Sequence, residues 1–172
     1  MLTELGEKYN IRVIVIPPIK IGDSIVSSTL IREAVARGDM EKVFELLGRH
    51  YSITGTVQTG KMLGRSMGFP TANIHPEPYL ILPRYGVYVT RTFLDGEFYP
   101  SITNVGDNPT VTQAGRVKIE THIINFDNNI YNKNIEVFFL SKIRNQIKFN
   151  NRNELKEQIA KDVFSAKEYF NI

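Results

Sequence analysis

Short alternating runs of apolar and polar residues fill the chain from Tyr51 onward, and they predict antiparallel β-strands. Turns rich in Gly, Pro and Asn separate five such runs, at residues 52–57, 86–92, 98–103, 117–126 and 134–141. In the fourth run one face carries Ile119, Thr121 and Ile123, and the other carries Lys118, Glu120 and His122. Closely spaced antiparallel strands of this kind close into a small barrel or a sandwich.

Helical spacing appears on both sides of this region. Near the C-terminus, apolar residues recur at Leu155, Ile159 and Val163 with charged residues between them, which predicts an amphipathic helix. Before residue 51 two helices are predicted, one ended by Gly38 and the next capped by Asp39. Their apolar positions are Leu30, Ile31, Ala34 and Val35 in the first helix, and Met40, Val43, Phe44 and Leu47 in the second.

The first 50 residues also contain one predicted strand. Residues 11–16 form an apolar run that ends at Pro17 and Pro18, which is typical of a buried strand from a parallel sheet. A single strand cannot form a sheet. We therefore expect residues 1–50 to be the last part of a larger α/β unit, and residues 51–172 to be a separate domain. We also expect residues 1–24 to be the least firmly anchored part of the chain.

Composition narrows the class of protein. The 172 residues contain no cysteine, which excludes disulfides and thiolate metal sites and fits a cytoplasmic protein. No apolar run reaches the roughly 18 residues that a membrane-spanning helix requires, and the first residues do not have the pattern of a signal peptide. The net charge of +3 suits a phosphate-bearing ligand but is too small to indicate nucleic-acid binding by itself.

Three glycines and two cations alternate between residues 60 and 68. Backbone N–H groups beside glycine can approach an anion closely, so Gly60, Gly64 and Gly68 could form a phosphate-binding loop. Lys61 and Arg65 would add positive charge to it. The spacing is not that of a Walker A motif. The alternative interpretation is a glycine-rich hairpin with a proline turn, which needs no ligand.

Two side-chain oxygens follow this loop. Thr71 and Asn73 stand two residues apart, so in an extended segment their side chains point the same way. Neutral oxygens combined with phosphate oxygens are ligands that Mg²⁺ accepts. Thr71 and Asn73 could therefore bind Mg²⁺ together with a phosphate group, unless the segment is only a hairpin with a proline turn.

Glu120 is the candidate acid–base group. A carboxylate on the inner face of a barrel is costly unless it has a partner or a function, so Glu120 could act as a general base toward a hydroxyl. The alternative is an exposed glutamate on an amphipathic strand, and His122 is expected to be a structural or surface residue. Residues 27–32 could hold phosphate at a helix start through hydroxyls and Arg32, although N-capping by Ser28 or Thr29 explains the same pattern.

Taken in order, these motifs resemble the riboflavin kinase family. The segment G-R-S-M-G-F-P-T-A-N at residues 64–73 is similar to the family signature. Similar segments also occur at residues 55–57, 83–88, 103–110, 119–122 and 142–144 and at Phe149, so the resemblance covers about residues 50–170. Residues 26–32 and 46–49 resemble the end of the FMN adenylyltransferase domain that precedes the kinase in bacterial bifunctional FAD synthetases.

The resemblance implies a mainly β fold, a six-stranded antiparallel barrel with a C-terminal helix, preceded by a short α/β remnant. It implies Mg²⁺-dependent transfer of the terminal phosphate of ATP to riboflavin, giving FMN and ADP. Glu120 would take the proton from the ribityl 5′-hydroxyl. The ligand-binding residues implied are Gly60, Lys61, Gly64, Arg65, Gly68, Pro70, Thr71, Asn73 and, on the flavin side, Arg144. FMN adenylylation is not expected, because the 172-residue sequence contains no H-x-G-H phosphate-binding turn.

Two non-catalytic interpretations stay open. A small basic barrel with 8 Tyr and 10 Phe could bind single-stranded nucleic acid by stacking, but this would not explain Thr71, Asn73 or Glu120, so no nucleic-acid partner is expected. A flavin carrier or regulator derived from the kinase, without turnover, is the second alternative, and the sequence does not exclude it. The sequence predicts no particular oligomeric state.

Overall fold

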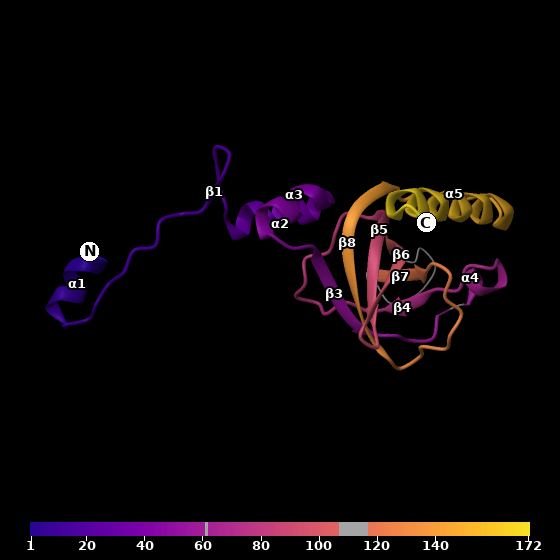
Figure 1. Ribbon diagram of the computed structural model, residues 1–172, viewed down its shortest axis with the longest axis horizontal. Coiled ribbons are helices and arrows are strands. Elements are labelled where there is room, and N and C mark those ends of the chain that lie inside the picture. Colours follow the sequence, from indigo (N-terminus) through magenta and orange to yellow (C-terminus); the bar gives the residue numbers. More distant parts are fainter. Residues whose placement is uncertain (61, 107–116) are drawn as a thin grey trace.

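A six-stranded antiparallel sheet forms the centre of the computed structural model, which describes residues 1–60, 62–106 and 117–172 (Figure 1). The strands are β3 (Tyr51–Thr56), β4 (Ala72–Ile74), β5 (Gly86–Leu94), β6 (Glu97–Gly106), β7 (Lys118–Ile123) and β8 (Asn134–Asn145). Their order in the sheet is β3-β8-β5-β6-β7-β4. The mainly β fold and the five predicted strands are confirmed. The sixth strand, β4, has only 3 residues, too few to show an alternating pattern.

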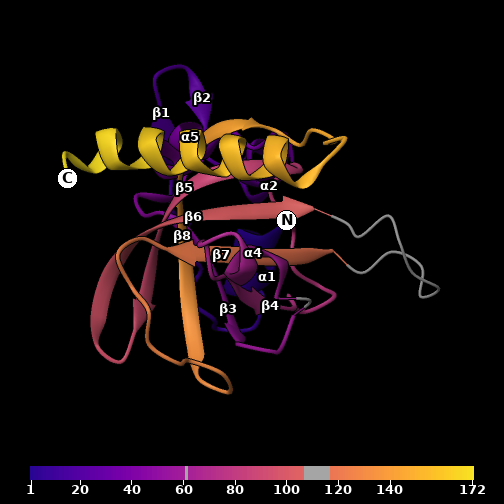
Figure 2. The same ribbon diagram turned by 90° about the vertical axis from the view of Figure 1, so that its right-hand side faces the viewer.

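The sheet curls into a half-barrel whose two edges approach each other (Figures 1 and 2). Just after β3, the backbone N–H of Gln58 donates to the carbonyl oxygen of Asn73 in β4 at 2.8 Å, which forms one antiparallel bridge between the edges. The concave side encloses the main apolar core, which includes Ile53, Ile74, Ile119, Ile135, Val137 and Phe139.

A row of five hydroxyl groups also crosses this interior. Successive oxygens in the row lie 2.8 or 2.9 Å apart, and the row passes through β5, β6 and β7 in the order Thr92, Ser101, Thr90, Thr103 and Thr121. All five side chains are fully buried, but each has a hydrogen-bond partner, so their burial costs little. Because Thr121 points inward, its neighbours Glu120 and His122 must point to the outer face of the sheet.

Helix α5 (Arg152–Phe170) lies across that outer face (Figure 2). Its predicted apolar positions Ile159 and Val163 pack against a second core, which consists of Val87, Val89, Ile102, Ile124, Leu140 and Ala166. The predicted C-terminal helix is therefore confirmed, and it covers the face of the sheet opposite to the main core.

Two short helices, α2 (Ser28–Arg37) and α3 (Met40–Leu47), precede the barrel. Gly38 ends α2 with φ 78°, and the side chain of Asp39 accepts from Lys42 N at 3.0 Å, as predicted. The cap of α2 is Ser27 rather than Ser28 or Thr29, because it is Ser27 Oγ that accepts from a backbone N–H of the first turn, at 3.2 Å. The predicted apolar stripe of α3 is wrong at one position: Leu46 is buried, whereas Phe44 is 44% exposed and packs against His50.

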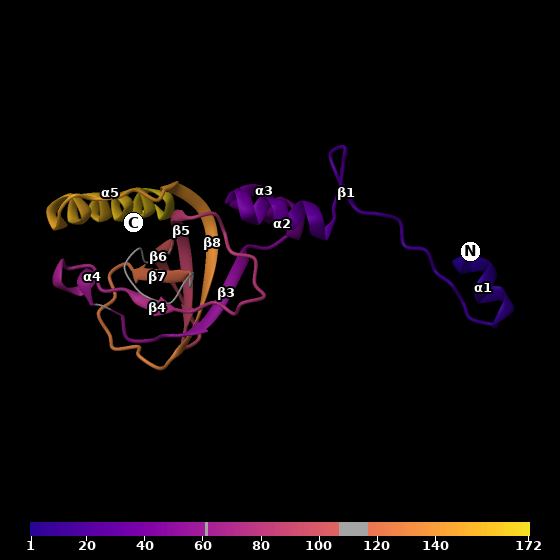
Figure 3. The same ribbon diagram turned by 180° about the vertical axis from the view of Figure 1, so that it is seen from behind.

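The predicted strand at residues 11–16 is wrong. This segment pairs with no strand within the described ranges, and Ile14, Val15 and Ile16 are 69%, 80% and 82% exposed. It links α1 (Leu2–Lys8) to a small hairpin, β1 (Lys20–Ile21) and β2 (Ser24–Ile25), and projects away from the barrel (Figure 3). The run has the composition of a buried strand, but burial requires neighbouring strands. Among the helices of the described ranges, none has both the length and the hydropathy needed to cross a membrane.

Candidate active site

The glycine-rich segment contains one short helix, α4 (Leu63–Ser66), followed by a tight turn. The N–H of Phe69 donates to the carbonyl oxygen of Gly64 at 2.9 Å, and a Cβ on Gly64 would lie 2.3 Å from the Phe69 carbonyl oxygen. A Cβ on Gly60 would lie 2.5 Å from the side-chain nitrogen of Asn73, and Gly68 has φ +89°. Contact with the backbone thus requires glycine at position 64, the positive φ favours it at position 68, and a side chain at position 60 would displace the Asn73 amide, all independently of any ligand. Lys61 lies outside the described residues.

Asn73 lies next to Glu120 across the β4–β7 pair. The two residues are register partners, so their side chains leave the same face of the sheet. Asn73 is only 7% exposed, and its Oδ1 accepts no hydrogen bond from the described residues. Its Nδ2 lies 3.4 Å from the carbonyl oxygen of Thr71. A buried oxygen without a donor is costly, and it marks a position where a cation or a ligand donor fits.

One continuous row of residues crosses the outer face of five strands. The register pairs Asn73 with Glu120, Glu120 with Asn104, Asn104 with Val87, and Val87 with Arg144. All five residues line the same groove. The row brings together three predicted site residues that are far apart in the sequence. It also corrects one expectation, because Glu120 lies on the outer face of the barrel rather than on the inner face.

Two cavities meet at one end of this row. The larger, of about 410 Å³, lies between the outer sheet face, the glycine-rich loop and α5. The smaller, of about 160 Å³, lies between the same loop and the segment after β7. Met62, Thr71 and Asn73 line both cavities and therefore form a shared wall. Apolar groups dominate the larger cavity, among them Met67, Phe69, Ile102, Ile147, Phe149, Leu155 and Ile159. The smaller is lined by polar groups that include Arg65, Asp127, Asn128 and Asn129.

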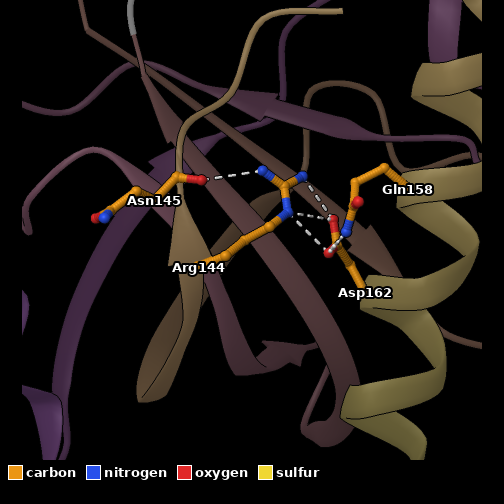
Figure 4. A network of polar contacts seen from close by, with 4 residues as sticks. All are labelled: Arg144, Asn145, Gln158 and Asp162. Atoms are coloured by element: carbon orange, nitrogen blue, oxygen red, sulfur yellow. Dashed lines mark hydrogen bonds and ion pairs between the residues drawn. The ribbon is translucent and has the colours of Figure 1, made fainter.

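Arg144 fastens α5 to the sheet at the other end of the row. Its Nε lies 2.8 and 3.1 Å from the two carboxylate oxygens of Asp162, and one terminal nitrogen lies 2.7 Å from Asp162 Oδ2 (Figure 4). The other terminal nitrogen donates to the Asn145 carbonyl oxygen, and Gln158 donates to Asp162 Oδ1 at 2.9 Å. Asp162 is 2% exposed, so this forked ion pair is largely shielded from water. The guanidinium lies at the groove, but it is already engaged by the protein.

His122 also lines the larger cavity, beside Glu120 on the outer face of β7. Its Nδ1 lies 2.8 Å from the carbonyl oxygen of Pro70, and its ring packs edge-on against Phe69 with centroids 5.6 Å apart. Burial lowers the pKa of His122 below 6.5, and the hydrogen bond to Pro70 opposes this in part. Burial therefore favours the neutral imidazole at pH 7.

The remaining predicted residues divide between the cavities. Gly60, Arg65 and Pro70 line the smaller one, and Gly64 lines the larger one. Gly68 and residues 27–32 line neither, so the phosphate-binding role considered for them has no support from their position. In the part of the chain that the structure describes, no three His, Asp or Glu side chains converge as metal ligands, which leaves the neutral oxygens of Thr71 and Asn73 as the candidates.

Sequence reasoning missed two residues of the groove. Asn104 belongs to a segment that resembles the family, but only the β6–β7 register shows that it adjoins Glu120. The sequence predicts a structural or surface role for His122, although the alternation along β7 places it on the same face as Glu120. The pairing of β6 with β7 and the contact of His122 with Pro70 both join distant segments. The local pattern of apolar and polar residues therefore cannot predict them.

Comparisons with known proteins agree on one family. The family model described as riboflavin kinase matches residues 47–170. A relative from Buchnera aphidicola subsp. Schizaphis graminum, named bifunctional riboflavin kinase/FMN adenylyltransferase, is 39% identical over 100% of this chain and 56% of its own length. A relative of the same name from Haemophilus influenzae is 44% identical over 85% of this chain and 47% of its own length. This chain thus spans about half the length of the curated relatives that it matches.

Solved structures show the same fold. A crystal structure from Streptococcus pneumoniae, described as a macrolide-efflux protein, has a TM-score of 0.85 and 31% identity, and the match covers 95% of this chain and 54% of that one. The crystal structure of riboflavin kinase from Trypanosoma brucei has a TM-score of 0.51 at 20% identity, with 72% and 81% of the two chains covered. At that identity the second likeness supports the fold alone.

Proposed function

The chain belongs to the riboflavin kinase family, and we propose that it transfers the terminal phosphate of ATP to the 5′-hydroxyl of riboflavin, giving FMN and ADP. One observation carries the proposal: Thr71 and Asn73 form a wall between two cavities, and Glu120 adjoins that wall. Phosphoryl transfer between two substrates requires two binding sites that meet at one point, where charge can be neutralised and a hydroxyl deprotonated.

The character of the two linings supports a separate place for each substrate. The larger cavity combines apolar side chains from the loop, the sheet and α5, which suits the flat and largely apolar isoalloxazine ring of riboflavin. The smaller cavity carries Arg65 and the amides of Asn128 and Asn129, which suit the phosphates and polar groups of ATP. Lys61, the other cation of this segment, lies outside the described residues.

The residues present fit a divalent cation. Asn73 offers a buried oxygen that no described residue satisfies, and Thr71 adds a hydroxyl on the same wall. Hard oxygen ligands of this kind, completed by phosphate, suit Mg²⁺ better than a soft metal. When bound, Mg²⁺ would neutralise charge on the phosphates. The protein itself holds the two oxygens in place through the β4–β7 pairing and the glycine-rich loop.

Glu120 is the base in this proposal. Its carboxylate takes the proton of the 5′-hydroxyl, whose oxygen then bonds to the terminal phosphorus as the bond from that phosphorus to the bridging oxygen of ADP breaks. The register places Glu120 between Asn73 and Asn104, so two amides flank the carboxylate. Apolar side chains in the cavity wall disfavour water, which would otherwise compete with the hydroxyl for the phosphate.

We further propose that residues 1–50 belong to the adenylyltransferase part for which the bacterial relatives are named. The family model begins at residue 47, whereas the match to the Buchnera relative covers the whole chain. The exposed apolar run at residues 11–16 has the composition of a strand from a parallel sheet, as such a part would require. A cytoplasmic location is part of the same proposal.

The decisive experiment is direct. Purified protein is incubated with riboflavin, ATP and MgCl₂, and FMN and ADP are measured by chromatography. We expect equimolar FMN and ADP, and none with EDTA present. Flavin binding without FMN formation would instead favour the non-catalytic flavin-binding interpretation. Retention on a polyanion column without flavin binding would favour the nucleic-acid interpretation.

A further inference from the structure

His122 makes one hydrogen bond that determines its chemistry. The partner of Nδ1, at 2.8 Å, is the carbonyl oxygen of Pro70, and a carbonyl oxygen can only accept. Nδ1 must therefore carry the proton and donate. In a neutral imidazole the other nitrogen, Nε2, is then an acceptor with a free lone pair.

This second nitrogen has no hydrogen bond to any residue in the described ranges, while the residue itself lines the larger cavity. His122 stands two positions after Glu120 on the same strand face, about 7 Å farther along the strand. The edge contact with Phe69 and the bond to Pro70 hold the ring between β7 and the loop that leads to Thr71. Its orientation is therefore fixed before any ligand enters.

We propose that His122 is a substrate-orienting residue, in which Nδ1–H holds the loop at Pro70 and Nε2 accepts a hydrogen bond from a hydroxyl of the polyol chain of the flavin substrate. The proposal rests on the proposed function, since it names a contact of the same substrate. A linear polyol lying along β7 reaches Glu120 with its terminal hydroxyl and His122 with an earlier one. Burial also lowers the pKa of the ring, which keeps the lone pair available at pH 7.

Two substitutions separate the two nitrogens. In His122→Asn the amide nitrogen takes the place of Nδ1, so the bond to Pro70 can persist while the acceptor in the cavity is lost. In His122→Gln the longer side chain places an amide oxygen near the position of Nε2 while the bond to Pro70 is lost. Riboflavin affinity is measured by quenching of flavin fluorescence, and Mg-ADP affinity is measured by calorimetry.

We expect His122→Asn to weaken riboflavin binding about tenfold, because one hydrogen bond to the acceptor in the cavity is lost, and to leave Mg-ADP binding unchanged. His122→Gln should keep riboflavin affinity within about threefold of wild type and weaken Mg-ADP binding, because the loop before Thr71 loses its anchor. Lumiflavin has the same ring without the polyol, so its affinity should be equal in wild type and His122→Asn.

Unchanged riboflavin affinity in His122→Asn, or an equal loss for riboflavin and lumiflavin, would overturn the inference. If wild type forms FMN while either result is obtained, the proposed function stands and only the role of His122 fails. If wild type neither binds riboflavin nor forms FMN, the proposed function fails first. Thermal unfolding of both variants identifies a folding defect. We expect His122→Asn to lose affinity for riboflavin only and His122→Gln to lose affinity for Mg-ADP only. A general loss of structure cannot produce this pattern.

Discussion

Asn73 and Glu120 face each other across the β4–β7 pair, and their side chains leave the same face of the sheet. Asn73 contributes a buried oxygen to which no described residue donates, and Glu120 contributes a carboxylate at the edge of the larger cavity. The amide oxygen of Asn73, which can bind a cation, thus lies beside the carboxylate of Glu120, which can take a proton. This one pairing joins the proposed metal ligand to the proposed base, although the two residues are far apart in the sequence.

Glu120→Gln should lower kcat by about a hundred- to ten-thousandfold, because the amide fills the same space but cannot take a proton. Binding of Mg-ADP should stay within about threefold of wild type, since the carboxylate is not a proposed nucleotide ligand. The measurement is steady-state formation of FMN. Glu97→Gln, at an exposed position of β6 outside both cavities, is the matched control and should be neutral. A kcat near wild type in Glu120→Gln would remove Glu120 from the mechanism.

Asn73→Leu and Thr71→Val should each raise the Mg²⁺ concentration needed for half-maximal activity by about tenfold or more, because each removes one oxygen from the shared wall. Asn73→Leu should not lower the free energy of unfolding of the ligand-free protein by much, since the lost Oδ1 has no partner among the described residues. Thr56→Val, whose hydroxyl bonds to Asn134 at an exposed edge, is the control. The same Mg²⁺ dependence in all three variants would refute the metal assignment.

Much of the barrel could be predicted because its strands obey a local rule. Ile119, Thr121 and Ile123 alternate with polar residues, and the structure buries these three and turns the others to the outer face. The same reasoning failed at residues 11–16. An apolar run shows that a segment is suited to a buried strand, but it does not show whether a partner strand is present. It failed again at Phe44, because which side of a short helix faces the barrel depends on the contacts of α3 with β3 and β8.

The site was predictable as residue types but not as an arrangement. The spacing of Thr71 and Asn73 indicated two oxygens on one side, and the structure confirms that both line the same wall. The adjacency of Asn104 to Glu120 depends on strand register, and the position of Arg144 depends on Asp162, which lies in the apolar stripe of α5. Such pairings arise only when distant segments meet.

Stability should fall as the pH falls below about 6.5, in part through His122. Burial lowers its pKa in the folded protein below the ordinary value of 6.5, so between these two pKa values the unfolded chain binds more protons than the folded one. The free energy of unfolding must therefore decrease with falling pH in that window. His122→Asn lacks this titration, so its stability should decrease less steeply than that of wild type. The check is urea unfolding between pH 7.5 and 5. Equal slopes in the two proteins would contradict the prediction.

Removing one partner of the Arg144–Asp162 ion pair should destabilise the fold more than removing both. Asp162→Asn leaves the half-buried guanidinium without its charge partner, and we expect a loss of about 3–5 kcal/mol in the free energy of unfolding. Replacing both residues with apolar ones, in Arg144→Met with Asp162→Leu, should recover most of this loss, because an uncompensated buried charge no longer exists. Asp95→Asn, which breaks the exposed ion pair with Lys133, should change stability by less than about 1 kcal/mol and is the control.

The same double variant decides whether Arg144 also contacts the flavin. All three of its guanidinium nitrogens already bond to Asp162 or to the Asn145 carbonyl oxygen, so its primary role in the structure is to hold α5 over the groove. If that is its entire role, the double variant, once its stability is recovered, should bind riboflavin within about threefold of wild type. If Arg144 also donates to the flavin, riboflavin affinity should stay about tenfold weaker in the double variant despite normal unfolding, because one charge-assisted hydrogen bond is missing. Fluorescence titration of riboflavin beside urea unfolding of the same preparations separates the two roles.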